Sequence, residues 1–170
     1  LEDVLRQVTI LGAVTGNVGA ATDVVADLEL RVANVLAATP ILDEPLTYFH
    51  ELDDTLFTVT SSTFVGSVYG LLGLVNVADA ADPDGAAFGY PQLSTEFLLA
   101  SDPDLVFLAD SRCCDQDATT FAARPGFSDL RAVVDGGVIV LDDDVASRWG
   151  PRIVNLLEQI AAAVRQVAAR

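Results

Sequence analysis

The stretch from Tyr90 to Ala109, YPQLSTEFLLASDPDLVFLA, decides the fold class of this chain. An aromatic residue precedes a proline-stiffened turn. Ser94 is placed to cap a short helix whose first turn holds Glu96, where a carboxylate suits the positive end of the helix dipole. The turn Asp102–Asp104 then leads into Leu105–Ala109, an apolar strand of the kind that is buried on both faces. This order of elements predicts an α/β domain.

Helices and strands alternate along the rest of the chain, which predicts a three-layer α/β/α lobe with a central, mostly parallel sheet. Two amphipathic helices are expected first, separated by a break at Gly12 or around residues 15–17. The other expected elements are strands at 47–52, 56–60 and 138–141, helices at 64–72 and 119–123, a helix containing Leu130 and Val133 that Asp129 caps, and a last helix from Ile153 with Pro151 in its first turn.

The composition excludes several classes of partner. The 170 residues carry a formal net charge of −16, with 25 acidic and nine basic residues and no Lys-rich stretch. Binding to a phosphate backbone or to an anionic membrane needs clustered Lys and Arg, so we expect neither nucleic acid nor a membrane surface as a partner. No apolar run approaches the roughly 18 residues that a membrane span needs.

Motifs for catalysis and metal binding are absent from the sequence. There is no Walker loop, no dinucleotide-binding glycine motif and no nucleophile elbow, and the single histidine, His50, is expected within a strand as a structural residue. The run Asp142–Asp144 lacks EF-hand spacing and is interpreted as a solvated acidic loop. We therefore expect no catalytic residues, no metal site and no cofactor.

Two features of the loops stay open at this level. Cys113 and Cys114 are adjacent, which suits no zinc site; they form either a vicinal disulfide in an oxidising compartment or two free thiols. Three aromatic residues, Phe57, Tyr90 and Trp149, are expected in loops, where they either bind a large planar ligand or pack over the sheet ends. Arg148 and Arg152 are cationic donors near Trp149, and Arg148 either orients an anionic group or pairs with the acidic run.

Taken together, these segments resemble the C-terminal lobe of the substrate-binding proteins of iron-siderophore and cobalamin ABC importers. The resemblance extends over nearly the whole chain. Its motifs are the helical segment Leu1–Val35 with Leu11-Gly12 and Thr15-Gly16, the segments Ser61–Phe64 and Leu71–Asn76, the aromatic-Pro-x-hydrophobic-Ser-x-Glu stretch Tyr90–Glu96, and the closing segment Asp142–Arg152.

The resemblance implies an extracytoplasmic, periplasmic or lipid-anchored protein. Such a protein captures a ferric siderophore or cobalamin-like molecule between two lobes and delivers it to a permease. Ligand-facing positions in this chain would be Tyr90, Phe57, Asp144, Ser147, Arg148 and Trp149. Glu96 matches a glutamate that docks onto permease arginines. Some relatives have an aromatic residue at the position of Val145, so this aromatic wall is either missing here or supplied by Trp149.

The resemblance also implies a division of the chain. Residues 1–40 would form the connecting helix between the lobes and the helix that follows it, and residues 41–170 the C-terminal ligand-binding lobe. The chain begins at Leu1 within a helical pattern, so we expect an N-terminal lobe of the same polypeptide upstream. The alternatives are a metal-ion-binding member of the same superfamily and a fragment of a small α/β enzyme whose catalytic residues lie elsewhere.

Overall fold

Four short strands form the sheet at the centre of this computed structural model, which describes residues 1–170. All three strand pairings are parallel, and Phe49 of the first strand lies in register with Val106. In spatial order the strands are β2 (Val75–Asn76), β1 (Thr47–Glu51), β3 (Leu105–Leu108) and β4 (Val138–Val140). The expected parallel α/β architecture is confirmed.

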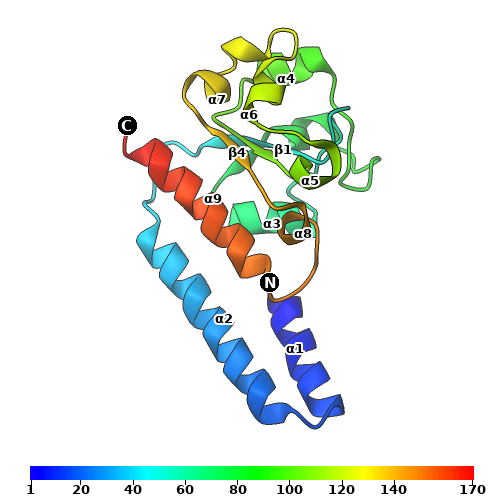
Figure 1. Ribbon diagram of the computed structural model, residues 1–170, viewed down its shortest axis with the longest axis vertical. Helices are drawn as coiled ribbons and strands as arrows, with labels where there is room; N and C mark the ends of the chain where they lie inside the picture. The colour runs from blue at the N-terminus through cyan, green and yellow to red at the C-terminus, as the bar shows by residue number, and fades with distance from the viewer.

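Nine α-helices and two 3₁₀ helices surround the sheet (Figure 1). Their bounds are α1 Glu2–Val14, α2 Val18–Ala38, α3 Phe64–Gly70, η1 Val77–Ala81, α4 Thr95–Ser101, α5 Ser111–Cys114, α6 Ala118–Ala122, η2 Phe127–Asp129, α7 Arg131–Val134, α8 Asp143–Ala146 and α9 Ile153–Ala168. None of these helices combines the length and the apolar character needed to cross a membrane.

Side chains of β1 and β3 alternate between two hydrophobic cores, one on each face of the sheet. Tyr48 and Phe107 pack with residues of α2, α3 and α9. Phe49 and Val106 point the other way and pack with residues of α4, α6 and α7. This alternation produces the three layers that the sequence predicted.

The first two helices form an antiparallel hairpin that projects from the body of the lobe (Figure 1). The chain turns at Thr15–Asn17, where Gly16 has a positive φ of 72°. Gly12 stays inside α1 and lies against Ala21 so closely that a side chain would collide. Along its second half α2 is held to α9, because Arg31 donates to Glu158 at 2.9 Å and to Asn155 at 2.6 Å.

The turn Asp102–Asp104 anchors the start of β3 as predicted. Asp104 accepts hydrogen bonds at 2.8 Å from the backbone and the hydroxyl of Thr47, and it forms an ion pair with Arg131 at 2.6 Å. Ser94 caps α4, since its hydroxyl accepts from the backbone N–H of Phe97 at 3.1 Å. The cap of α4 and the turn thus define how the chain enters the central strand.

The strand expected at 56–60 is not part of the sheet. Leu56 has a φ of 68°, so the chain turns back sharply after β1. The segment then runs beside residues 89–93, where Thr58 donates its backbone N–H to Pro91 and Thr60 donates to Gly89. Pro91 has no N–H to return, so the ladder stops at isolated bridges. The edge position beside β1 is taken by β2, which was not predicted as a strand.

Two helix starts also differ from the prediction. Asp129 does not cap α7; the backbone N–H of Arg131 donates instead to Asp102 at 2.7 Å, an interaction between residues 29 positions apart. Pro151 precedes α9, which begins at Ile153. The sequence predicts a solvated loop at Asp142, whereas in the structure the carboxylate of Asp142 caps the short helix α8.

Candidate functional site

The carboxyl ends of β1, β3 and β4 lie at one edge of the parallel sheet, and the loops that follow them carry most of the predicted ligand residues. In open α/β sheets, ligands bind in the crevice outside this edge. Phe57 comes from the loop after β1, and the group Asp144–Trp149 comes from the segment after β4. We therefore take this edge as the candidate site.

Phe57 and Tyr90 lie on two segments that are hydrogen-bonded to each other. Phe57 forms an isolated antiparallel bridge with Gln92, two residues from Tyr90. The two residues are 39% and 50% exposed, although large aromatic side chains usually bury most of their surface. Their rings are thus available to a ligand at this edge.

The second group of predicted residues follows β4. Asp144 lies in α8, and Ser147, Arg148 and Trp149 lie exposed in the turn after it. Arg148 donates from Nε to Asp144 at 2.9 Å, and its NH2 group lies 2.7 Å from the same carboxylate oxygen. In the structure Arg148 therefore pairs with the acidic run, which is one of the two roles that the sequence left open.

Trp149 supplies the aromatic surface of this turn. Its ring packs on Phe64 with centroids 4.1 Å apart, and the residue remains 46% exposed. Val145 is buried in the core and offers no surface. Phe64 opens α3 directly after residues 60–63, which contact the loop of Tyr90 through Gly89. One continuous segment thus connects the two groups of candidate residues.

Glu96 lies apart from these residues, in the exposed first turn of α4. In Figure 1 α4 is at the end of the lobe opposite the tip of the α1–α2 hairpin. No ion pair in the chain involves Glu96.

A buried charge cluster lies under the site, and the sequence analysis missed it. Glu51 ends β1, Asp110 lies two residues beyond β3, and both are fully buried. Arg124 donates to both carboxylate oxygens of Glu51 at 2.7 Å, whereas neither oxygen of Asp110 has a hydrogen-bond partner. Arg124 thus pairs with Glu51, and Asp110 is a second buried carboxyl group without a hydrogen-bond partner. Their position directly at the ends of strands was the signal that could have revealed them.

Burial raises the pKa of both carboxyl groups. The pKa of Glu51 rises from 4.5 to about 7, because loss of water outweighs the attraction of Arg124 and because Asp110 adds repulsion. The pKa of Asp110 is also raised, chiefly by burial. Between pH 4.5 and about 7 the folded protein keeps a proton that the unfolded chain releases. The contribution of Glu51 and Asp110 to the free energy of unfolding therefore decreases as the pH rises from 4.5 to about 7.

Replacing Asp110 by asparagine is expected to reduce this loss of stability, because it removes the contribution of Asp110 and its repulsion of Glu51, while burial still raises the pKa of Glu51. Relative to wild type, the free energy of unfolding of Asp110→Asn should increase by about 1–3 kcal/mol between pH 5 and pH 8, measured by urea denaturation. The measurement compares the two proteins because His50 is present in both. Burial lowers the pKa of His50 to about 4, and this contribution makes stability rise with pH. A difference that stays constant from pH 5 to pH 8 would contradict the raised pKa of Asp110.

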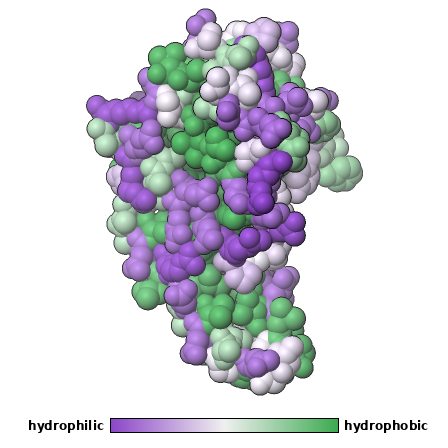
Figure 2. All heavy atoms as spheres, viewed as in Figure 1, coloured by the Kyte–Doolittle hydropathy of each residue, from purple (hydrophilic) through white to green (hydrophobic).

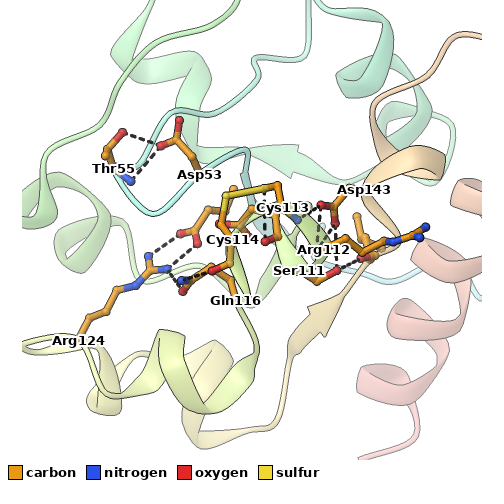
Figure 3. The surroundings of a disulfide bond; sticks show 12 residues. Asp53, Thr55, Ser111, Arg112, Cys113, Cys114, Gln116, Arg124 and Asp143 are labelled. Atoms are coloured by element: carbon orange, nitrogen blue, oxygen red, sulfur yellow. Dashed lines mark hydrogen bonds and ion pairs between the residues drawn. A yellow bond between two sulfur atoms is a disulfide. The ribbon is translucent and has the colours of Figure 1, made fainter.

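His50 has the structural role expected of it. It is buried in β1, and its Nδ1 atom lies 2.7 Å from the hydroxyl of Tyr69. No group of three or more His, Cys, Asp or Glu side chains is placed to hold a metal ion. Cys113 and Cys114 are joined by a disulfide, which decides between the two alternatives for the pair (Figure 3).

Comparison with known proteins places the chain among binding proteins. The sequence profile of the family described as periplasmic binding protein matches residues 1–145. A cobalamin-binding protein of Halobacterium salinarum is 32% identical over 169 residues, which cover 96% of this chain and 44% of that protein. An uncharacterised ABC transporter substrate-binding lipoprotein of Bacillus subtilis is 24% identical over 95% of this chain and 50% of its own length.

The fold agrees with this match. The crystal structure of the periplasmic vitamin B12 binding protein of Vibrio cholerae superposes with a TM-score of 0.79 at 21% identity, covering 98% of this chain and 62% of that one. At this identity the likeness establishes the fold alone. The chain spans about half the length of the curated relatives it matches.

Proposed function

Because this chain belongs to the periplasmic binding protein family, we propose that it forms the C-terminal lobe of the substrate-binding component of an ABC importer. The match over residues 1–145 is the observation that carries the proposal. In this role the protein captures its ligand in a cleft, delivers it to a permease and catalyses no reaction. It works outside the cytoplasm, in the periplasm or anchored by lipid at the outer face of the membrane.

The ligand that we propose is a corrinoid, with a ferric siderophore as the second candidate. The cobalamin-binding protein of H. salinarum, at 32% identity, supports the corrinoid. Both ligand types present large faces that exposed aromatic rings can cover, and Phe57, Tyr90 and Trp149 offer such rings at the sheet edge. Asp144, Ser147 and Arg148 would supply the polar contacts, with Arg148 leaving Asp144 to meet an anionic group.

The other wall of the cleft would come from an N-terminal lobe of the same polypeptide. The tip of the α1–α2 hairpin exposes Ile10, Leu11, Val14 and Val18, between 52% and 73% each. Apolar surface is visible around this tip in Figure 2, and an adjoining lobe would cover it. Residues 1–40 would then contain the connection between the lobes, and a rigid helical connector would limit the cleft to modest closure.

We assign permease docking to Glu96. Its carboxylate is exposed and has no partner within the chain, so an arginine of a permease can pair with it at no cost to the fold. The same carboxylate also suits the dipole of α4, but that contribution needs no partner and is small at an exposed site.

The test of the proposed function is a fluorescence titration of the full-length protein with Trp149 as the reporter, any other tryptophans having been replaced. The panel contains cobalamin, cobinamide, haem and ferric hydroxamate and catecholate siderophores. Saturable quenching by one class would support the proposal and identify the ligand. If none of them binds to verified folded protein, the alternatives are a metal-ion binder or an enzyme fragment, and titration with divalent cations addresses the first.

Tyr90→Ala is expected to weaken binding of the identified ligand by about 1–3 kcal/mol, because the exposed ring would lose its contact with the ligand face. The dissociation constants of the two proteins in the same titration measure this loss. Tyr90→Phe keeps the ring and serves as the matched control, with affinity close to that of wild type. Equal affinity for wild type and Tyr90→Ala would make Tyr90 a packing residue.

A further inference from the structure

The disulfide turn Cys113–Cys114 lies at the same sheet edge as the candidate site. It forms the end of α5, which follows β3 at the same sheet edge as the loops after β1 and β4. Arg112 forms ion pairs with Asp142 at 3.3 Å and with Asp144, a proposed ligand contact, at 3.7 Å. The surroundings of the turn in Figure 3 include Asp53 and Thr55 of the loop that leads to Phe57.

The loop after β4 holds the first half of the turn. The carboxylate of Asp143 accepts the backbone N–H of Cys113 at 2.9 Å, that of Arg112 at 3.0 Å and the hydroxyl of Ser111 at 2.9 Å. Ser111 also donates to the carbonyl of Leu141 at 2.7 Å. These bonds lower the pKa of Asp143, so it remains an ionised acceptor.

The second half of the turn is connected to the buried charge cluster. Gln116 donates to the carbonyl of Cys114 at 3.2 Å and accepts from Arg124 at 2.7 Å. Arg124 in turn holds Glu51, the last residue of β1. The turn is therefore fixed to the ends of β1 and β4 as well as to its own strand, which is the kind of support that preorganises a binding surface.

Stability of the fold does not account for this disulfide. A bond between neighbouring residues closes the shortest loop in the chain, where the gain from restricting the unfolded state is smallest. Both cysteines are exposed, and neither belongs to the two hydrophobic cores. The bond instead gives the surface two adjacent sulfur atoms in a rigid turn, and sulfur is polarisable and packs well against aromatic faces.

We propose that the Cys113–Cys114 turn contacts the ligand and covers part of a planar, conjugated face such as a corrin, porphyrin or catecholate ring. This proposal rests on the proposed function, because it adds a third contact region between the loops of Phe57 and Trp149. An extracytoplasmic location keeps the disulfide oxidised. Loss of the bond would let the two sulfur atoms move apart and weaken binding, while the hydrogen bonds of the turn to Asp143 and Gln116 remain.

The test compares the full-length protein with its Cys113→Ser/Cys114→Ser variant in titrations with cobalamin, cobinamide, haem and the ferric siderophores. Binding of the compound that wild type prefers is expected to be about three- to tenfold weaker in the variant. Wild type is also reduced with a phosphine, which with water converts the disulfide to two thiols and becomes the phosphine oxide. After the phosphine is removed under nitrogen, the reduced protein should show the same loss.

Controls separate the two proposals. The double-serine variant, treated with phosphine in the same way, should bind as it did before treatment, which excludes effects at other sites. If wild type binds one compound and both the variant and the reduced protein bind it equally well, the contact proposal is overturned and the proposed function stands. Weaker binding by the variant with no effect of reduction also overturns it.

If wild type binds none of the compounds, the proposed function itself fails. If the variant does not fold, the proposal is tested by reduction of the wild-type protein alone.

Discussion

Replacing Arg124 by alanine is expected to lower the free energy of unfolding by about 3–5 kcal/mol, the cost typical of removing one partner of a buried ion pair. Arg124 donates to both oxygens of the fully buried Glu51 at 2.7 Å. Its guanidinium also lies 5.0 Å from the ring centroid of Phe121, so the variant loses a cation–π contact as well. Urea denaturation at pH 7 measures the loss.

The pH dependence and a surface control make this prediction specific. Without the guanidinium the pKa of Glu51 and that of Asp110 must rise further, so the loss should be larger at pH 8 than at pH 5. Arg6→Ala removes an ion pair with Asp3 whose side chains are 70% and 57% exposed, and we expect a change below about 0.5 kcal/mol there. Equal effects of Arg124→Ala and Arg6→Ala would show that the buried cluster does not hold the strand ends together.

Replacing Glu96 by alanine is expected to reduce ligand uptake by cells about tenfold or more while leaving ligand affinity unchanged. The loss of one charged partner from a desolvated ion pair across an interface typically costs about 2–5 kcal/mol, and about 1.4 kcal/mol corresponds to a factor of ten. The affinity should not change because Glu96 is exposed in α4 and contacts no candidate ligand residue. Uptake of labelled ligand and the fluorescence titration give the two quantities.

The matched control is Glu44→Ala, which removes the same charge from another exposed position, in the segment between α2 and β1. Uptake with this variant should equal that of wild type. If Glu96→Ala transports at the wild-type rate, Glu96 only stabilises the first turn of its helix. If it binds ligand less well, it acts on the lobe itself rather than on a permease.

Several structural predictions succeeded because their causes lie close together in the sequence. The Ser94 cap joins residues three positions apart, and the central strand at 105–108 is apolar throughout because both of its faces are covered. The same applies to the long helices, whose apolar spacing is visible within one segment. Most of the predicted ligand residues lie outside helices and strands, and the alternation of elements places several of them after strand ends. The exposed rings of Phe57, Tyr90 and Trp149 agree with a binding surface, and their contact with a ligand remains a prediction.

What the sequence by itself determined is therefore the α/β class, the order of most elements and the family resemblance that the profile match confirmed. Only the tertiary structure decided that residues 56–60 leave the sheet, that β2 takes the edge position, and that Arg124 reaches Glu51 from 73 residues away. It also decided that Asp143 supports the disulfide turn from 30 residues away. The physical reason is that capping and periodicity act within one or two turns of chain. Strand pairing and buried ion pairs depend instead on which distant segments the fold brings into contact.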